Sequence, residues 1–272
     1  MKSFLSMLFC SIFAIVFHAM LPQDANQAVM DSIFVEKLGA PVVGSIYFIV
    51  LYSFCMIIIQ KYGKDTPMSG LELGLRYGLG FGLIYQVGMF ELVPGSYWNM
   101  NVLVNQFWVG FGDLVPAVIL ALLIAMFSMK KKGIKVYFRA NKNSATLGLG
   151  VSVSYFVFRI IGYYTGLITS SIHEYFVPVV VWTMFMSFAI YGMVLLWFPI
   201  YEKGNMKEVI VKMLLFSFGI NWMWFNSFML LIKKDMFIVI FLRVCIDIIA
   251  VIVGASLWYA FLEKKHKGMN TQ

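Results

Sequence analysis

Charged residues are scarce in this chain of 272 residues. Asp, Glu, Lys and Arg together make up 12% of the sequence, whereas hydrophobic residues make up 61% and the mean hydropathy is +0.84. So few charges leave too little polar surface to cover a water-soluble globule. At about 20 residues per membrane-spanning helix, the apolar residues suffice for about eight helices. The composition therefore predicts an all-α integral membrane protein with eight transmembrane helices, and it excludes a large domain outside the membrane.

Residues that hold metals or act as nucleophiles are equally few. The three cysteines, Cys10, Cys55 and Cys245, lie far apart in apolar segments and are interpreted as buried hydrophobic side chains. No histidine is followed by another three or four residues later, which excludes an intramembrane metalloprotease helix and a paired-histidine haem site. The chain also lacks a Gly-x4-Gly-Lys phosphate loop and a Gly-x-Ser-x-Gly nucleophile elbow. We therefore expect no metal, no cofactor, no enzymatic activity and no ATP-driven transport by this chain alone.

What the chain does have is long apolar segments. Eight of them are long enough to cross a bilayer, at residues 3–21, 40–59, 71–92, 102–129, 145–169, 176–200, 209–232 and 236–262. The first follows Lys2 as a secretory signal would, but Phe17 stands where a cleavage site needs a small residue, so an uncleaved helix is predicted. Residues 24–39 carry apolar side chains at near-helical spacing and predict a short helix on the outer surface.

The cations lie mostly on one side of these segments. If the N-terminus is cytoplasmic, 15 of the 21 Lys and Arg residues fall on the inner side: Lys2, Lys61, Lys64, Lys130, Lys131, Lys132, Lys135, Arg139, Lys142, Lys203, Lys207, Lys212, Lys264, Lys265 and Lys267. The outer side holds three cations, Lys37, Lys233 and Lys234, and six acids, Asp24, Asp31, Glu36, Glu91, Glu174 and Asp235. The positive-inside rule therefore predicts a protein of the cytoplasmic membrane with both termini inside.

This topology accounts for the net charge of +8. A nucleic-acid partner would need cations gathered on a folded polar face, and no such face is available. The basic loop at residues 130–142 is expected to lie against the anionic lipids of the inner leaflet.

Three short segments recur at about half the length of the chain. Pro41-Val42-Val43 recurs as Pro178-Val179-Val180 and Phe81-Gly82-Leu83 as Phe218-Gly219-Ile220, both 137 residues later, and Phe107 with Asp113 recurs as Phe241 with Asp247, 134 residues later. A tandem four-plus-four duplication is the hypothesis. Residues 1–129 would form the first four-helix repeat, 130–144 the basic cytoplasmic linker, and 145–272 the second repeat with its basic tail. Both repeats would have the same orientation, and a shared pathway would lie between them.

Four charged residues are expected near the middle of the membrane. At about 1.5 Å per residue, Asp113 and Asp247 lie about 16 Å from the outer start of their helices, and Arg159 about 21 Å from the inner start of its own. Arg243 precedes Asp247 by four residues and can pair with it. Each unpaired charge would cost at least about 2.5–3.5 kcal/mol at a helix centre, so we expect the four to form a neutral cluster between the halves.

This cluster, with Asn221 and Asn226, is the predicted substrate or proton site. Gln86 adds another amide at comparable depth. The alternative interpretation is that the charges are structural ion pairs that fix helix register, and that the amides are interhelical hydrogen-bonding groups.

The third apolar segment carries glycine at every fourth position, at Gly70, Gly74, Gly78 and Gly82. Such a ladder predicts close backbone contact with a neighbouring helix. Glu72 and Arg76 lie about 200° around the helix from these glycines, taking about 100° per residue. They are expected near the inner surface, as a snorkelling pair or as an inner gate.

The first functional hypothesis is a small secondary transporter or permease for a small polar or anionic solute. The alternative is a membrane assembly factor, sensor or accessory subunit that transports nothing and whose buried charges are structural. A lipid-modifying intramembrane enzyme is a third hypothesis, with Glu91, His173 and Glu174 as its only candidate residues.

Overall fold

The computed structural model describes residues 1–21, 32–129, 131, 133–138, 142–202, 204–232 and 234–269, and this part of the chain is helical without any β-strand. Its long helices are α1 (Lys2–Met20), α3 (Ala40–Gly63), α4 (Gly70–Met89), α5 (Met100–Leu123), α6 (Lys142–Tyr164), α7 (Phe176–Tyr201) and α11 (Phe237–Met269). The π-helix η3 (Ile124–Ser128) continues α5. A further long segment joins α8 (Met206–Val209), the π-helix η4 (Ile210–Ile220), α9 (Asn221–Asn226) and α10 (Phe228–Ile232).

Seven of these helical segments are long and apolar enough to cross a membrane. They begin and end within a few residues of the predicted segments, and α1 turns its large apolar side chains, such as Phe4, Phe9 and Ile12, to the outside of the bundle. By length and composition the chain is therefore a multi-pass membrane protein. The predicted segment 71–92 is a helix, α4, but it is not among the seven, because Glu72, Arg76 and its glycines lower its hydropathy.

The glycine ladder of α4 lies against α5. A Cβ atom added at Gly74 or Gly78 would lie 2.8 Å or 2.6 Å from the Cα atoms of Leu122 and Val118 respectively. At Gly82 the nearest atom would be Cγ of Leu114, at 2.7 Å, and at Gly70 the backbone oxygen of Lys131, at 2.5 Å. Since Leu114, Val118 and Leu122 are themselves spaced four apart, two straight ridges of the helices meet with only glycine hydrogens between them.

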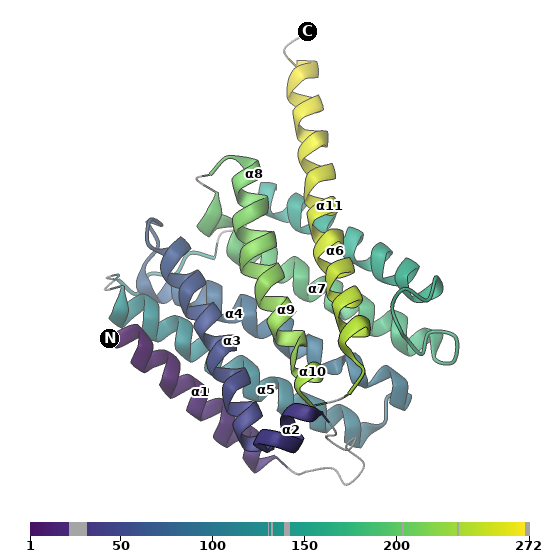
Figure 1. Ribbon diagram of the computed structural model, residues 1–272. Helices are drawn as coiled ribbons and strands as arrows, with labels where there is room; N and C mark the ends of the chain where they lie inside the picture. Colours follow the sequence, from purple (N-terminus) through teal and green to yellow (C-terminus); the bar gives the residue numbers. More distant parts are fainter. Residues whose placement is uncertain are drawn as a thin grey trace.

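The helices of the two halves of the chain make corresponding contacts. In the first half α1 packs on α3 and α5, and α4 packs on α5; in the second half α6 packs on α7 and α11, and η4 packs on α11. Across the halves, α4 contacts α7 while α3 contacts η4 and α9. Figure 1 shows α3 and the η4–α9 segment side by side, with the end of α11 projecting beyond the bundle. This arrangement is the one that a duplication would produce, and it supports that hypothesis.

Two predicted surface segments fall partly outside the described residues. Of the helix expected at 24–39, the structure describes α2 (Ile33–Leu38), which is capped by the Ser32 hydroxyl and exposes Ile33 and Phe34; residues 24–31 are not described. Of the basic loop, the described residues 131 and 133–138 form no helix. Two short 3-10 turns, η1 (Phe90–Leu92) and η2 (Pro94–Ser96), connect α4 to α5.

Candidate functional site

Four charged side chains meet between the ends of α4, α6 and α11. The Arg159 guanidinium donates to both carboxylate oxygens of Asp247, at 2.5 Å from Nε and 2.6 Å from Nη2. Its Nη1 atom donates to Oε1 of Glu91 at 2.7 Å, and Arg243 donates to Oε2 of Glu91 at 2.8 Å. We call these four residues the ion network. With two acids and two bases its formal charge is zero, as the cost of burying charge requires.

The composition of the network differs from the prediction in one residue. Asp113, expected in the cluster, lies in the first half instead, where its carboxylate contacts His18 at 3.1 Å. Glu91, counted from the sequence as an acid of the outer surface, takes the place expected for Asp113. The predicted pair between Arg243 and Asp247 on one face of their helix is also wrong, because Arg243 reaches Glu91 instead. Arg159 and Asp247 do meet.

The inner part of the network is completely enclosed. The side chains of Arg159 and Asp247 are both 0% exposed. Asp247 also accepts a hydrogen bond of 2.8 Å from Nε1 of Trp222, and Arg159 donates one of 2.8 Å to the Tyr163 hydroxyl. The indole ring of Trp182 lies 5.4 Å from the guanidinium carbon, within cation–π range. Every charge here has partners, so a bidentate pair of this kind is stable without water.

The outer part of the network is accessible. Glu91 and Arg243 are 18% and 14% exposed, and they line a cavity of about 160 Å³, here called the outer cavity after the predicted orientation. The same cavity is lined by Trp182 and by the hydroxyl-bearing residues Thr169, Ser170 and Ser171. Burial alone would raise the pKa of Glu91, but the guanidinium groups of Arg243 and Arg159 outweigh it and hold that pKa below its ordinary value.

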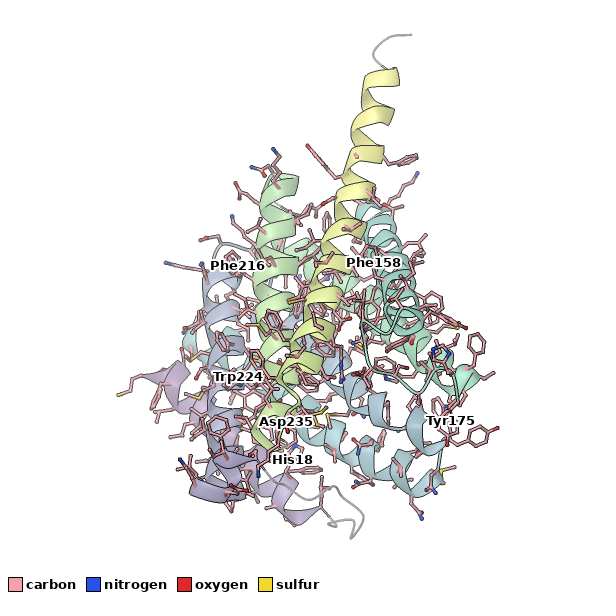
Figure 2. The ribbon with its side chains drawn as sticks, turned by 45° about the vertical axis from the view of Figure 1, so that its right-hand side comes forward. His18, Phe158, Tyr175, Phe216, Trp224 and Asp235 are labelled. Carbon is pink, nitrogen blue, oxygen red and sulfur yellow. The ribbon has the colours of Figure 1, made fainter. Side chains whose placement is uncertain are left out.

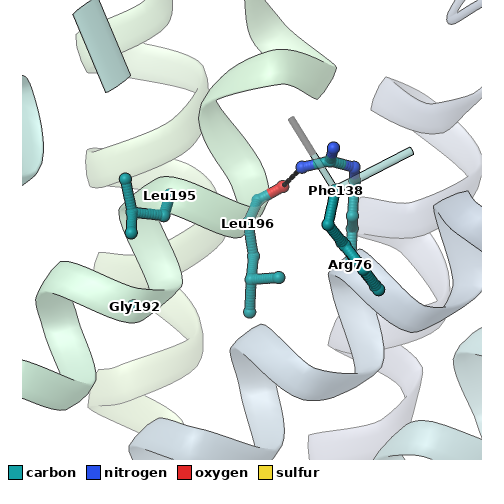
Figure 3. A pocket seen from close by; sticks show the side chains of 5 residues that line it. All are labelled: Arg76, Phe138, Gly192, Leu195 and Leu196. Carbon is teal, nitrogen blue, oxygen red and sulfur yellow. Dashed lines mark hydrogen bonds between the residues drawn. The ribbon is translucent and has the colours of Figure 1, made fainter. Parts of the chain in front are cut away.

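A second cavity of about 260 Å³, the inner cavity, lies against Arg76 of α4 and Leu195 and Leu196 of α7. Arg76 donates to Oε1 of Glu72 at 2.9 Å, to the Leu196 carbonyl at 3.1 Å and to the Tyr137 carbonyl at 2.9 Å. Figure 3 shows the guanidinium directed at the Leu196 carbonyl with Phe138 beside it. The expected snorkelling pair is wrong, since Glu72 and Arg76 are 6% and 2% exposed. The pair instead holds the basic loop onto α7.

The predicted amides do not join the ion network. Asn221 accepts a hydrogen bond of 2.6 Å from the Tyr85 hydroxyl, and its amide faces Cys55 at 3.4 Å. Asn226 donates to the Trp222 carbonyl one turn earlier, and Gln86 donates to the Phe107 carbonyl. These are contacts within and between helices. Their part in a substrate site stays a prediction.

Glu91 and Trp222 are the site residues that the sequence did not indicate. Glu91 follows α4 by two residues and was assigned to a loop, yet an acid that directly follows an apolar helix can fold back onto the helix end. Trp222 stands where the duplication places Tyr85, and it reaches Asp247 from η4–α9. The described residues contain no group of three or more His, Cys, Asp or Glu side chains that could hold a metal ion. Comparison with known proteins finds no matching family model, no matching curated protein and no matching solved structure.

Proposed function

We propose that the protein is a secondary transporter or permease of the cell membrane for a small polar or anionic solute. In this proposal all eight long helical segments cross the membrane, both termini are cytoplasmic, and the chain has neither enzymatic activity nor a resident cofactor. The observation that carries the proposal is the ion network, whose accessible members Glu91 and Arg243 form the floor of the outer cavity.

The lining of the outer cavity suits a small solute with an anionic group. Nε of Arg243 is buried and has no hydrogen-bond partner among the described atoms, so this guanidinium keeps a donor to offer. Thr169, Ser170 and Ser171 add hydroxyl groups on the same wall. A cavity of about 160 Å³ is smaller than the pockets of drug-sized ligands. It suits a solute of a few heavy atoms or several waters.

The two cavities lie at opposite ends of one interface between the halves. Trp182 and Val179 of α7 line the outer cavity, and Leu195 and Leu196 of the same helix line the inner one. Between them α4 and α7 are in contact: Trp182 donates to the Val87 carbonyl at 3.0 Å. Further along, a Cβ atom at Gly80 would lie only 2.0 Å from Nε1 of Trp197. Two cavities separated by a closed middle are what alternating access between repeats requires.

At the inner end, Glu72 and Arg76 form the gate in this proposal. Their contacts with Leu196 and Tyr137 close the inner cavity under the basic loop. The loop itself is proposed to rest on anionic lipids of the inner leaflet, because its cations are close together and would lie at the headgroups.

Uptake into reconstituted vesicles tests this function. We name three radiolabelled solutes as probes, acetate, inorganic phosphate and succinate. The wild-type protein is expected to take up at least one of them, and Arg243→Gln should reduce that uptake at least tenfold. Lys212→Gln is the matched control, because Lys212 is 44% exposed and pairs with Glu208 on the surface. Normal uptake by Arg243→Gln, or uptake of none of the probes by the wild type, would contradict the proposal.

The second candidate, an assembly or accessory subunit, is favoured by the enclosure of Arg159 and Asp247. A network whose charges are satisfied internally can serve to fix the helices and nothing more. In that case the wild type takes up none of the probes, and Arg243→Gln changes only the thermal stability of the protein in detergent.

A further inference from the structure

A second buried ion pair lies in the first half, away from the ion network. Nε2 of His18, on α1, lies 3.1 Å from Oδ1 of Asp113, on α5. The two side chains are 22% and 5% exposed. The function proposed above uses neither residue.

This pair occupies the place in the first half that Arg159–Asp247 occupies in the second. Each acid lies on the fourth long helix of its half and reaches the first, α1 or α6. The residue after each acid packs on a glycine of the third helix: Leu114 lies on Gly82, and Ile248 on Gly219. Both pairs of contacts follow the offsets of 134 and 137 residues seen in the sequence.

The two pairs differ in their base. An arginine stays protonated in proteins, so the pair with Asp247 keeps its charges at any physiological pH. A histidine changes its charge between about pH 5 and pH 8. At the same place in the fold, one half therefore has a fixed ion pair and the other has a pair that can lose a proton.

The surroundings of His18 leave the charge of Asp113 dependent on it. Among the described residues, His18 is the only ion-pair partner of Asp113. The other titratable groups facing the pair are neutral at physiological pH: Tyr47, Tyr52 and Cys55 from α3, and Cys10 from α1. The hydroxyl of Tyr52 donates to the backbone carbonyl of Asp113 and not to its side chain.

The approach of α1 to α5 is built around the imidazole. A Cβ atom at Gly112 would lie 3.0 Å from Nε2 of His18 and 2.6 Å from Cδ1 of Phe17, so this position on α5 is open to the ring because it is a glycine. The ring of Phe48 on α3 packs against the other side, with centroids 4.9 Å apart. His18 lies two residues before the end of α1, and Figure 2 shows it toward the same end of the molecule as Asp235. This end is the predicted outer side.

We propose that His18 and Asp113 form a proton-binding site in the first half of the protein. In the occupied state the imidazolium and the carboxylate carry opposite charges and sum to zero. When Nδ1 of His18 releases its proton to water, the neutral ring still donates its Nε2–H to Asp113, and the site has a charge of −1. A buried carboxylate without a counter-charge is unfavourable, so release of the proton favours rearrangement of α1 against α5.

Direct observation of the imidazole tests the site. The chain has three histidines. With isotope-labelled histidine, in nanodiscs, we expect an NMR signal that titrates between about pH 5 and pH 8 and is absent in His18→Gln. Asp113→Asn should change the midpoint of this titration, whereas the matched variant Asp235→Asn, with an exposed acid at the same end, should not. A His18 signal that is constant over this range, or a midpoint unaffected by Asp113→Asn, overturns the proposal.

Exchange of the base separates this site from the transport function, on which only its use in proton coupling rests. His18→Arg copies the pair of the second half, and the variant should fold while losing the wild type's change in melting temperature between about pH 5 and pH 8. In vesicles, an imposed pH gradient should accelerate wild-type uptake of a transported probe several-fold and leave uptake by His18→Arg unchanged. Equal acceleration of the variant overturns coupling through this pair. Absence of all wild-type uptake would contradict the transport function, while the NMR titration would still decide the proton site.

Discussion

The two halves of the protein place an acid at the same point and balance it differently. Asp247 is fully buried, holds both nitrogens of the Arg159 fork and accepts a third bond from Trp222. Asp113 has a single contact of 3.1 Å to a histidine that is 22% exposed. The same position in the fold can therefore fix a bundle or respond to its surroundings, depending on whether the base can give up its proton.

The helix contacts beside these pairs differ in the opposite sense. In the first half α4 and α5 meet along the glycine ladder, whose close approach leaves no room for a side chain. In the second half the corresponding helix is the π-helix η4, where the Ser217 hydroxyl donates to the Lys212 carbonyl five residues earlier. π-Helical turns are rare and are often found at functional sites. The first half thus joins a rigid helix contact to a titratable pair, and the second joins a π-helix to a fixed pair.

The same substitution in the two halves should expose this difference most strongly. Asp247→Asn leaves the buried guanidinium of Arg159 without its main counter-charge, and loss of one partner of a buried pair costs about 3–5 kcal/mol. Asp113→Asn leaves a histidine that can become neutral, so we expect about 1 kcal/mol, the value of one hydrogen bond. Thermal unfolding in detergent at pH 7.5, followed with a thiol-reactive dye, measures both, since Cys10 and Cys55 are buried until the protein unfolds.

Equal melting temperatures for the two variants would contradict the distinction between a fixed and a titratable pair. Asp235→Asn serves as the control for the change of side chain, because Asp235 lies in an exposed turn with a backbone φ of 57°, a conformation that asparagine tolerates.

Helix positions could be predicted from the sequence because a membrane sets the length of an apolar segment. The segment expected at 176–200 is α7, Phe176–Tyr201, and the one expected at 40–59 is α3, Ala40–Gly63. The count was less certain at α4, where glycines replace the apolar side chains that usually mark a membrane helix. Those glycines face α5, so the same residues that lower its hydropathy allow its burial.

The site could be predicted only in part because depth along a helix says nothing of position around the bundle. Depth and charge correctly brought Arg159 to Asp247. Asp113 lies at a similar depth, but residues related by a duplication occupy equivalent places in each half and share one site only near the axis between them. Glu91 reaches the network through the turn η1, whose direction no periodic pattern records.

Removal of the acid that joins the two arginines should have the next largest effect. At pH 7, Glu91→Gln loses two charge-assisted hydrogen bonds and should destabilise the protein by about 1.5–3 kcal/mol, toward the lower value because Glu91 is partly exposed. The pKa of Glu91 is lowered in the folded state, so its contribution is complete above the unfolded value of about 4.3 and is lost as the pH falls through the folded pKa.

The melting temperatures of the wild type and Glu91→Gln should therefore differ at pH 7 and converge as the pH falls below about 4. Glu208→Gln, in a surface pair with Lys212, controls for general effects of acid. A difference that stays constant down to about pH 3 would show that Glu91 contributes packing and not charge.

Alanine in place of glycine compares the two helix contacts with the smallest change. At Gly78 the new Cβ would lie 2.6 Å from a backbone atom of Val118, so α4 and α5 must separate, and we expect destabilisation of about 1–3 kcal/mol. At Gly219 the nearest neighbours are the Leu214 carbonyl at 3.2 Å and the flexible end of Ile248 at 3.3 Å. There the gain in helix propensity should offset the contact to within about 0.5 kcal/mol.

Gly44→Ala is the matched control for this last comparison, because a Cβ atom at Gly44 would meet no atom within 4 Å. This variant should be more stable than the wild type by about 0.5–1 kcal/mol, the helix propensity of alanine over glycine. Melting temperatures in the order Gly44→Ala, Gly219→Ala, Gly78→Ala, from highest to lowest, are expected. If Gly219→Ala were as damaging as Gly78→Ala, the contact between η4 and α11 would be as rigid as that between α4 and α5. The contrast between the halves would then lie in their ion pairs alone.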